Sequence, residues 1–187
     1  MIIGVTNIKG GVGKTTSSLA IATAAQRSGL SVTVVDTDPQ GSATLWAQAA
    51  EDADDPLPFP VVSKNQAEIR RMRERRPDRD GELIVIDTPP NGAVVDEAIK
   101  TADFVVIPTL SSPIDLQQTM LTAAQCQDAG KDYAVLIVMA RKGTNALRAF
   151  RTAVEEYGAG IFDTEIPLRE DFKADFGHTF RSNLNRS

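Results

Sequence analysis

The chain has 187 residues, of which 42% are hydrophobic and 24% charged, and its formal net charge is −5 at pH 7. The length fits one domain spanning 1–187, and the composition is ordinary for a globular protein. The negative charge argues against a protein that coats nucleic acid over its whole surface, although it allows a local basic patch. The single cysteine, Cys126, excludes a disulfide framework within one chain.

No apolar run approaches the roughly 20 residues that a membrane-spanning helix needs, so we expect no membrane contact. The first four residues, Met-Ile-Ile-Gly, carry no basic stretch and lead directly into a glycine-rich segment. This start is unlike a signal peptide. We therefore expect a cytoplasmic protein.

Short runs rich in valine and isoleucine alternate with longer stretches that have helical character. The expected strands cover 2–5, 32–35, 83–86, 104–107 and 134–139, with a sixth short strand near 161–166. The expected helices cover 14–28, 42–50, 64–76, 92–101, 115–129 and 145–157. Alternation of this kind predicts an α/β fold in which three layers, α/β/α, enclose a mostly parallel central sheet. The acidic, proline-rich stretch 51–60 is expected to be a surface loop.

A glycine-rich segment, residues 9–16, follows the first expected strand and opens the first expected helix. At such a junction backbone N–H groups can surround a polyphosphate, and the positive end of the helix dipole points at the same anion. Lys14 supplies charge for the outer phosphates and Thr15 a hydroxyl for magnesium. Ile8 stands where the strict motif has glycine, and Lys9 is an additional lysine that ordinary phosphate loops lack.

Carboxylates follow two other expected strands. Asp36 and Asp38 come directly after 32–35, and Asp87 comes directly after 83–86. In open parallel sheets ligands bind at the carboxyl ends of the strands, and an acidic residue at a strand end is the usual second half of a nucleotide site. Two neighbouring carboxylates repel each other unless a cation or ordered water lies between them. A simple turn at Asp38 and a helix cap at Asp87 are the competing structural explanations.

The candidate residues belong to three sequence motifs: Lys-Gly-Gly-Val-Gly-Lys-Thr-Thr at 9–16, Asp-Thr-Asp-Pro-Gln-Gly at 36–41 and Asp-Thr-Pro-Pro at 87–90. In this order and spacing they resemble the deviant Walker A ATPases of the ParA/MinD superfamily, and most of all its small ParA-type partition ATPases. The resemblance spans about residues 1–140. It implies a P-loop NTPase fold that binds ATP or ADP with Mg²⁺.

By this resemblance, Lys9 is the signature lysine that reaches the phosphates of the nucleotide bound by a second subunit. Lys14 neutralises the phosphates within its own subunit, and Asp38 positions the attacking water. These three residues form the expected catalytic set. Charge supplied at the transferred phosphate by another subunit stabilises the transition state only in a dimer.

The resemblance also implies a metal site and nucleotide contacts. Thr15 would bind Mg²⁺ directly, while Asp36 and Asp87 would hold water molecules of the metal. The residues expected to contact the nucleotide are Lys9, Gly10, Gly11, Val12, Gly13, Lys14, Thr15, Thr16, Arg141 and Pro167.

The implied function is slow, Mg²⁺-dependent hydrolysis of ATP in DNA segregation. An ATP-bound homodimer would bind nonspecific DNA in the nucleoid, and a centromere-binding, ParB-type adaptor would stimulate hydrolysis and release. A close variant is an ATPase of the same type that positions a carboxysome or a chemoreceptor cluster. Two functions of a different class stay open: a small-molecule kinase with the arginines of 70–76 as a lid, and a nucleotide-gated scaffold without hydrolysis.

Three further segments each allow two interpretations. Val106-Ile107-Pro108 followed by residues 113–116 is similar to a proline-bearing loop that helps to form the dimer in small partition ATPases; on sequence grounds alone it is a strand exit with a proline before a helix. The basic run 70–76 is better explained as a solvated helix face than as a phosphate site. Phe172, Phe176 and Phe180 recur every four residues, which favours the packing stripe of a helix over a base-stacking surface.

Overall fold

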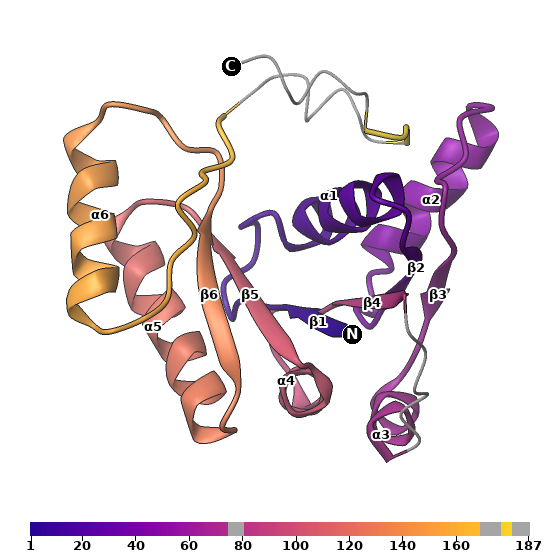
Figure 1. The fold of residues 1–187 in the computed structure, drawn as a ribbon, viewed down its shortest axis with the longest axis horizontal. Coiled ribbons are helices and arrows are strands. Elements are labelled where there is room, and N and C mark those ends of the chain that lie inside the picture. Colours follow the sequence, from indigo (N-terminus) through magenta and orange to yellow (C-terminus); the bar gives the residue numbers. More distant parts are fainter. Residues whose placement is uncertain (75–80, 169–176, 181–187) are drawn as a thin grey trace.

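The computed structural model describes residues 1–74, 81–168 and 177–180. Its strands are β1 (Ile2–Val5), β2 (Ser31–Asp36), β3 (Val61–Ser63), β4 (Glu82–Asp87), β5 (Phe104–Thr109) and β6 (Asp132–Ile137). Its helices are α1 (Lys14–Arg27), α2 (Ser42–Asp52), α3 (Gln66–Glu74), α4 (Ala93–Thr101), α5 (Pro113–Asp128) and α6 (Asn145–Glu156). Figure 1 shows how these elements are arranged.

The strands form one sheet in the order β3-β2-β4-β1-β5-β6, and every neighbouring pair is parallel. β1 lies in the middle, so the loop that follows it opens at the centre of one sheet edge. Asp87 pairs in register with Val5 of β1 on one side and with Asp36 of β2 on the other. The carboxyl ends of β1, β2 and β4 therefore meet at the edge where ligands bind in open parallel sheets.

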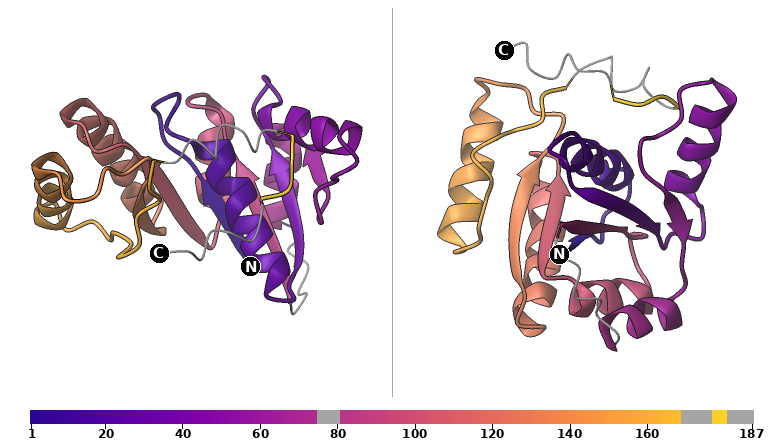
Figure 2. Two further views of the ribbon diagram at one scale, coloured as in Figure 1. Left: turned by 90° about the horizontal axis from the view of Figure 1, so that it is seen from above. Right: turned by 45° about the vertical axis from the view of Figure 1, so that its right-hand side comes forward.

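Helices cover both faces of the sheet. α1 and α2 lie on one face and α3 and α4 on the other, while α5 and α6 flank the β5–β6 end (Figures 1 and 2). On the α1 face the core includes Leu19, Trp46 and Phe180, and the Trp46 and Phe180 rings lie 5.5 Å apart. On the other face Ile69 of α3 and Ala98 of α4 pack against the sheet. Burial of this apolar surface is the main stabilising term of the fold.

The structure confirms the predicted α/β class, and the main differences lie in short edge elements. The sequence does not predict β3 at Val61–Ser63, whereas 161–166 contains no strand. This segment meets β6 through an isolated bridge between Ile161 and Val135 and through hydrogen bonds from the N–H groups of Phe162 and Ile166. Cys126 is buried in α5, and burial raises the pKa of its thiol to about 12. Phe172 and Phe176 lie outside the described residues, and Phe180 lies in an irregular segment, not in a helix.

Two arginines of the basic run are engaged in a structural contact. Arg70 and Arg73 on α3 lie 3.3 Å and 3.2 Å from the buried carboxylate of Glu97 on α4. They therefore join the two helices, which leaves less support for the lid that a small-molecule kinase would require. None of the helices within 1–74, 81–168 and 177–180 is long and apolar enough to cross a membrane.

Candidate functional site

The loop between β1 and α1 has the backbone geometry of a phosphate cradle. Gly11 and Gly13 adopt positive φ values of 75° and 73°, which side-chain-bearing residues rarely do. α1 begins at Lys14, and no side chain caps its N-terminus. The first N–H groups of a helix lack intrahelical partners. At this helix they remain available to an anion.

Lys14 lies buried at the start of α1. Its Nζ donates a hydrogen bond to the carbonyl oxygen of Lys9, 3.0 Å away, so the side chain folds back into its own loop. Burial lowers the pKa of Lys14, although the nearby charges of Asp87 and Asp38 raise it. A desolvated ammonium in this position is well placed to exchange the carbonyl for a phosphate oxygen.

Asp87 is fully buried at the end of β4 and is held by two hydroxyls of α1. Thr15 donates to one carboxylate oxygen at 2.7 Å and Ser18 to the other at 2.9 Å. Burial raises the pKa of Asp87 to about 7; the hydrogen bonds and Lys14 oppose this rise, and Asp36 adds to it. Without an additional cation, the site therefore disfavours the ionised form of Asp87.

The Thr15 hydroxyl and the Asp87 carboxylate are the oxygen donors that suit Mg²⁺, which proteins hold through one or two carboxylates together with substrate phosphates. Within the described part of the chain, no group of three His, Cys, Asp or Glu side chains could bind a metal ion by itself. The residues present therefore fit Mg²⁺ that arrives with a nucleotide. The expected metal role of Thr15 and Asp87 remains a prediction that this geometry favours.

Asp36 organises the loop that follows β2. One of its oxygens accepts from the backbone N–H of Asp38 at 3.1 Å, and the other accepts from both the backbone and the hydroxyl of Thr44 at 2.9 Å and 2.8 Å. It therefore fixes the first turn of α2 as well as the position of Asp38. Its expected role toward the water molecules of a metal stays a prediction. Asp38 itself is half-buried and accepts from the N–H of Gln40 at 2.9 Å, which forms a tight turn.

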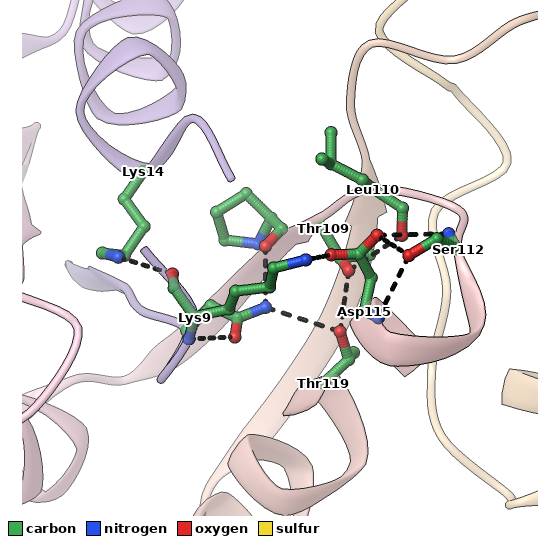
Figure 3. Close-up of polar contacts among 9 residues, drawn as sticks. Lys9, Lys14, Thr109, Leu110, Ser112, Asp115 and Thr119 are labelled. Carbon is green, nitrogen blue, oxygen red and sulfur yellow. Dashed lines mark hydrogen bonds and ion pairs between the residues drawn. The ribbon is translucent and has the colours of Figure 1, made fainter. Parts of the chain in front are cut away.

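Lys9 and Lys14 extend from the loop in opposite directions (Figure 3). The Lys14 ammonium turns inward, whereas the Lys9 ammonium contacts a carboxylate oxygen of Asp115 in the first turn of α5. The Lys9 side chain is 30% exposed and that of Asp115 2%. Burial alone would raise the pKa of Asp115, but hydrogen bonds from Lys9 and Ser112 and the charge of Lys9 hold it below its ordinary value.

Asn7 is a site residue that sequence reasoning missed. Its buried side-chain oxygen accepts from the backbone N–H of Lys9 at 2.9 Å, and its amide nitrogen donates to the carbonyl of Pro108 at 2.9 Å. Asn7 thus ties the loop to the end of β5. Ser18 was also missed, yet it lies one helical turn after Lys14 and could have been found from that spacing.

A hydrogen bond to α5 fixes the backbone at Ile8, and a capping box fixes the segment that begins at Ser112. The backbone N–H of Ile8 donates to the Thr122 hydroxyl of α5 at 3.2 Å, so the loop rests on that helix. Ser112 and Asp115 form a capping box at the start of α5, with Pro113 in its first turn. Residues 113–116 are therefore a helix start after a strand exit, while their expected role in a dimer is untested.

The two residues expected to contact the nucleotide outside the loop are brought close together. Ala140 pairs with Pro167, which places Pro167 beside Arg141. Gly13 faces this segment, because a Cβ added there would lie 3.7 Å from a methyl group of Val138. Val138, three residues before Arg141, therefore lies beside the phosphate loop. The contact of Arg141 and Pro167 with adenine remains a prediction.

Comparisons with known proteins show the family to which the chain belongs. Residues 3–179 match the CbiA family, described as the CobQ/CobB/MinD/ParA nucleotide binding domain. The chain is 30% identical over 179 residues to maintenance of carboxysome distribution protein A of Halothiobacillus neapolitanus, covering 91% of this chain and 81% of that protein. It is 26% identical over 193 residues to protein ParA of Rhizobium radiobacter, covering 98% and 85%.

Among solved structures, the fold is similar to the cell division ATPase MinD of Pyrococcus furiosus, with a TM-score of 0.75 and 18% identity over 100% of this chain and 92% of that one. At that identity the likeness concerns the fold alone. The family match over most of the length carries the assignment. The chain belongs to the CobQ/CobB/MinD/ParA family of nucleotide-binding domains.

Proposed function

We propose that this protein is a Mg²⁺-dependent ATPase of the ParA type. Its ATP-bound homodimer binds nonspecific DNA and positions a cargo, and an adaptor of the ParB type stimulates slow hydrolysis to ADP and phosphate. The observation that carries the proposal is the opposite orientation of Lys9 and Lys14 (Figure 3). One ammonium serves the cradle of its own subunit, and the other points away from that cradle, where a second subunit can receive it.

The remaining residues of the site have compatible roles. The glycine-rich loop and the start of α1 bind the phosphates, with Lys14 as their counter-charge. Asp38, half-buried beside this cradle, is the carboxylate that we propose orients the attacking water. Bound Mg²⁺ would add positive charge at the phosphate oxygens, with Thr15 and Asp87 as its protein contacts.

Exposed basic side chains near the site support contact with DNA. Arg141, Lys142 and Arg148 are exposed around the start of α6, next to the segment that borders the phosphate loop. Three phosphate contacts give DNA binding that weakens steeply with salt. Replacing Arg141, Lys142 and Arg148 by alanine should lower DNA affinity in ATP and reduce the salt dependence, while ATP binding by Arg148→Ala alone stays unchanged.

The cargo is the finer part of the proposal. The similarity to ParA supports a DNA cargo, and the similarity to a carboxysome distribution protein supports positioning of a protein body instead. Deletion of the gene in its own host separates the two. Loss of plasmid or chromosome inheritance supports the first, and clustering of a protein body with normal inheritance supports the second.

Complementation between two inactive variants tests the cross-subunit role of Lys9. A Lys9→Ala subunit retains Asp38 but cannot donate its lysine, whereas an Asp38→Ala subunit donates Lys9 but cannot orient water. Mixed dimers then contain one complete site of two. An equal mixture should recover about a quarter of wild-type ATPase activity, because about half of the symmetric dimers are mixed.

The control is Lys100→Ala, which removes one charge from an exposed position on α4. Alone it should hydrolyse ATP like the wild type. An equal mixture with Lys9→Ala should show about half of the wild-type activity, because only about half of its sites receive a lysine from a partner. A mixture of Lys9→Ala and Asp38→Ala that shows only the sum of their separate activities would refute the shared site. So would a Lys9→Ala variant that hydrolyses ATP at the wild-type rate.

A further inference from the structure

Lys9 has a defined partner within its own subunit. Its ammonium contacts Asp115, a nearly inaccessible carboxylate in the first turn of α5, 106 residues away in sequence. Asp115 also accepts a hydrogen bond from the backbone N–H of Ser112 at 3.2 Å and another from the Ser112 hydroxyl. The contact therefore joins the phosphate loop to the capping box of α5 (Figure 3).

The backbone of Lys9 is fixed while its side chain has a path to solvent. Asn7 holds the Lys9 N–H at 2.9 Å, and Lys14 holds the Lys9 carbonyl at 3.0 Å. Both contacts are independent of the position of the Lys9 ammonium. Since the side chain is 30% exposed, it can leave Asp115 by rotation about its own bonds, without rearrangement of the loop.

We propose that Asp115 is a positioning residue that holds the Lys9 ammonium within its own subunit, so that ATP-driven pairing of subunits must first break this contact. This inference rests on the proposed function, because it concerns regulation of the same shared site. In this proposal the Lys9 ammonium leaves Asp115 in order to reach the phosphates of a second subunit. The contact therefore opposes dimerisation, and it sets the protein concentration at which ATP drives pairing.

The contact between Lys9 and Asp115 also links the phosphate loop to the start of α5. When Lys9 leaves, Asp115 keeps the Ser112 hydrogen bonds but loses its nearest positive charge in a position with little access to water. A buried carboxylate without a counter-charge is unfavourable. Release of Lys9 therefore destabilises Asp115 and with it the first turn of α5, which also carries the exposed Ile114.

Asp115→Asn provides the test, because asparagine retains an oxygen that can accept from Ser112 but lacks the charge that holds Lys9. The first measurement uses the nucleotide-free chain and a brief pulse of an amine-acetylating reagent, with mass spectrometry of each lysine. Lys9 should react several-fold faster in Asp115→Asn than in the wild type, since an ion-paired amine is protected. Lys100 in the same samples should react at an unchanged rate.

The second measurement is self-association in ATP and Mg²⁺ by sedimentation. Both subunits must release their lysine, and each partly exposed ion pair raises the dimer dissociation constant a few-fold. The constant should therefore fall about tenfold in Asp115→Asn. Asp96→Asn removes an equivalent charge from the first turn of α4 and should leave the constant unchanged. Ser112→Ala removes the hydroxyl that contacts Asp115 but leaves the Asp115 charge that holds Lys9, so it should not reproduce the effect.

The two proposals fail in different ways. A wild type that does not self-associate in ATP would refute the proposed function, while the acetylation experiment would still decide whether Asp115 holds Lys9. If the wild type dimerises and Asp115→Asn dimerises equally or less well, the inference is overturned. Unchanged reactivity of Lys9 in Asp115→Asn overturns it as well.

A measurement on the wild type covers the case in which Asp115→Asn fails to fold. Salt screens an ion pair that solvent can reach, so acetylation of Lys9 should become faster as salt is raised, relative to that of Lys100 in the same samples. Equal responses of the two lysines to salt would overturn the inference without any variant at Asp115.

Discussion

Asp87→Asn should stabilise the nucleotide-free protein at pH 8, although it removes a residue of the candidate site. Asp87 is fully buried, and its pKa is raised from 3.8 to about 7 by that burial. This change corresponds to about 4 kcal/mol against the ionised form. Asparagine is neutral at every pH but accepts one hydroxyl hydrogen bond less well, which offsets about 2 kcal/mol. The net expectation at pH 8 is therefore a gain of about 2 kcal/mol.

The sign of the pH dependence follows from proton binding. Between pH 3.8 and about 7 the folded chain retains the Asp87 proton while the unfolded chain has lost it. Stability from this group is fully present below pH 3.8 and is lost as the pH rises through 7. The free energy of unfolding of Asp87→Asn relative to the wild type should accordingly rise from pH 4 to pH 8, by up to about 4 kcal/mol.

Urea unfolding in EDTA measures this difference, with fluorescence of the single tryptophan, Trp46, as the probe. Asp96→Asn, at an exposed position on α4, is the matched control and should show no comparable pH dependence. If the difference between Asp87→Asn and the wild type stayed constant from pH 4 to pH 8, Asp87 would be ionised in the folded chain. The assignment of a desolvated, cation-requiring carboxylate would then be wrong.

Three further substitutions test separate parts of the site. Ser18→Ala removes a hydrogen bond that lowers the pKa of Asp87, so the pH range over which the wild type loses stability should move upward in the same urea experiment. Asn7→Ala leaves the Lys9 N–H and the Pro108 carbonyl without their partner, and calorimetry or urea unfolding should record a loss of about 2 kcal/mol. Lys14→Ala should abolish binding of a fluorescent ATP analogue, whereas Lys9→Ala should bind it with near wild-type affinity; equal loss in both variants would contradict the division of roles.

The sequence predicts the parts of the fold that depend on local pattern. The ends of β1, β2 and β4 lie close to their expected positions, because each follows a run of buried valine and isoleucine and precedes a glycine or carboxylate motif. β3 is missed because Val61–Ser63 is short and half-exposed, and its extended form arises from pairing with β2. The segment 161–166 is over-predicted, since apolar character alone does not establish continuous pairing with β6.

In the candidate site too, local sequence motifs are predictable and contacts between distant residues are not. The phosphate loop and Asp87 can be identified from contiguous residues, because the motif itself encodes the strand–loop–helix geometry. The partners of these residues are not predictable in this way. Lys9 meets Asp115 across 106 residues, and Asn7 meets Pro108 across 101, so both contacts depend on how β1, β5 and α5 pack. Asp36 shows that a carboxylate next to a site can also fix a neighbouring helix, through Thr44.

Three ionisable groups of the site are each held by groups of the same subunit. Burial favours protonated Asp87, Lys14 bonds to a carbonyl of its own loop, and Lys9 contacts Asp115. Mg²⁺ and phosphate would reverse the first two arrangements within a subunit, because each brings the opposite charge. The third is different, since the Lys9 ammonium points away from the phosphate cradle of its own subunit. Under the proposed function, a second nucleotide-bound subunit offers Lys9 the phosphates as a new partner, so pairing of subunits would depend on nucleotide.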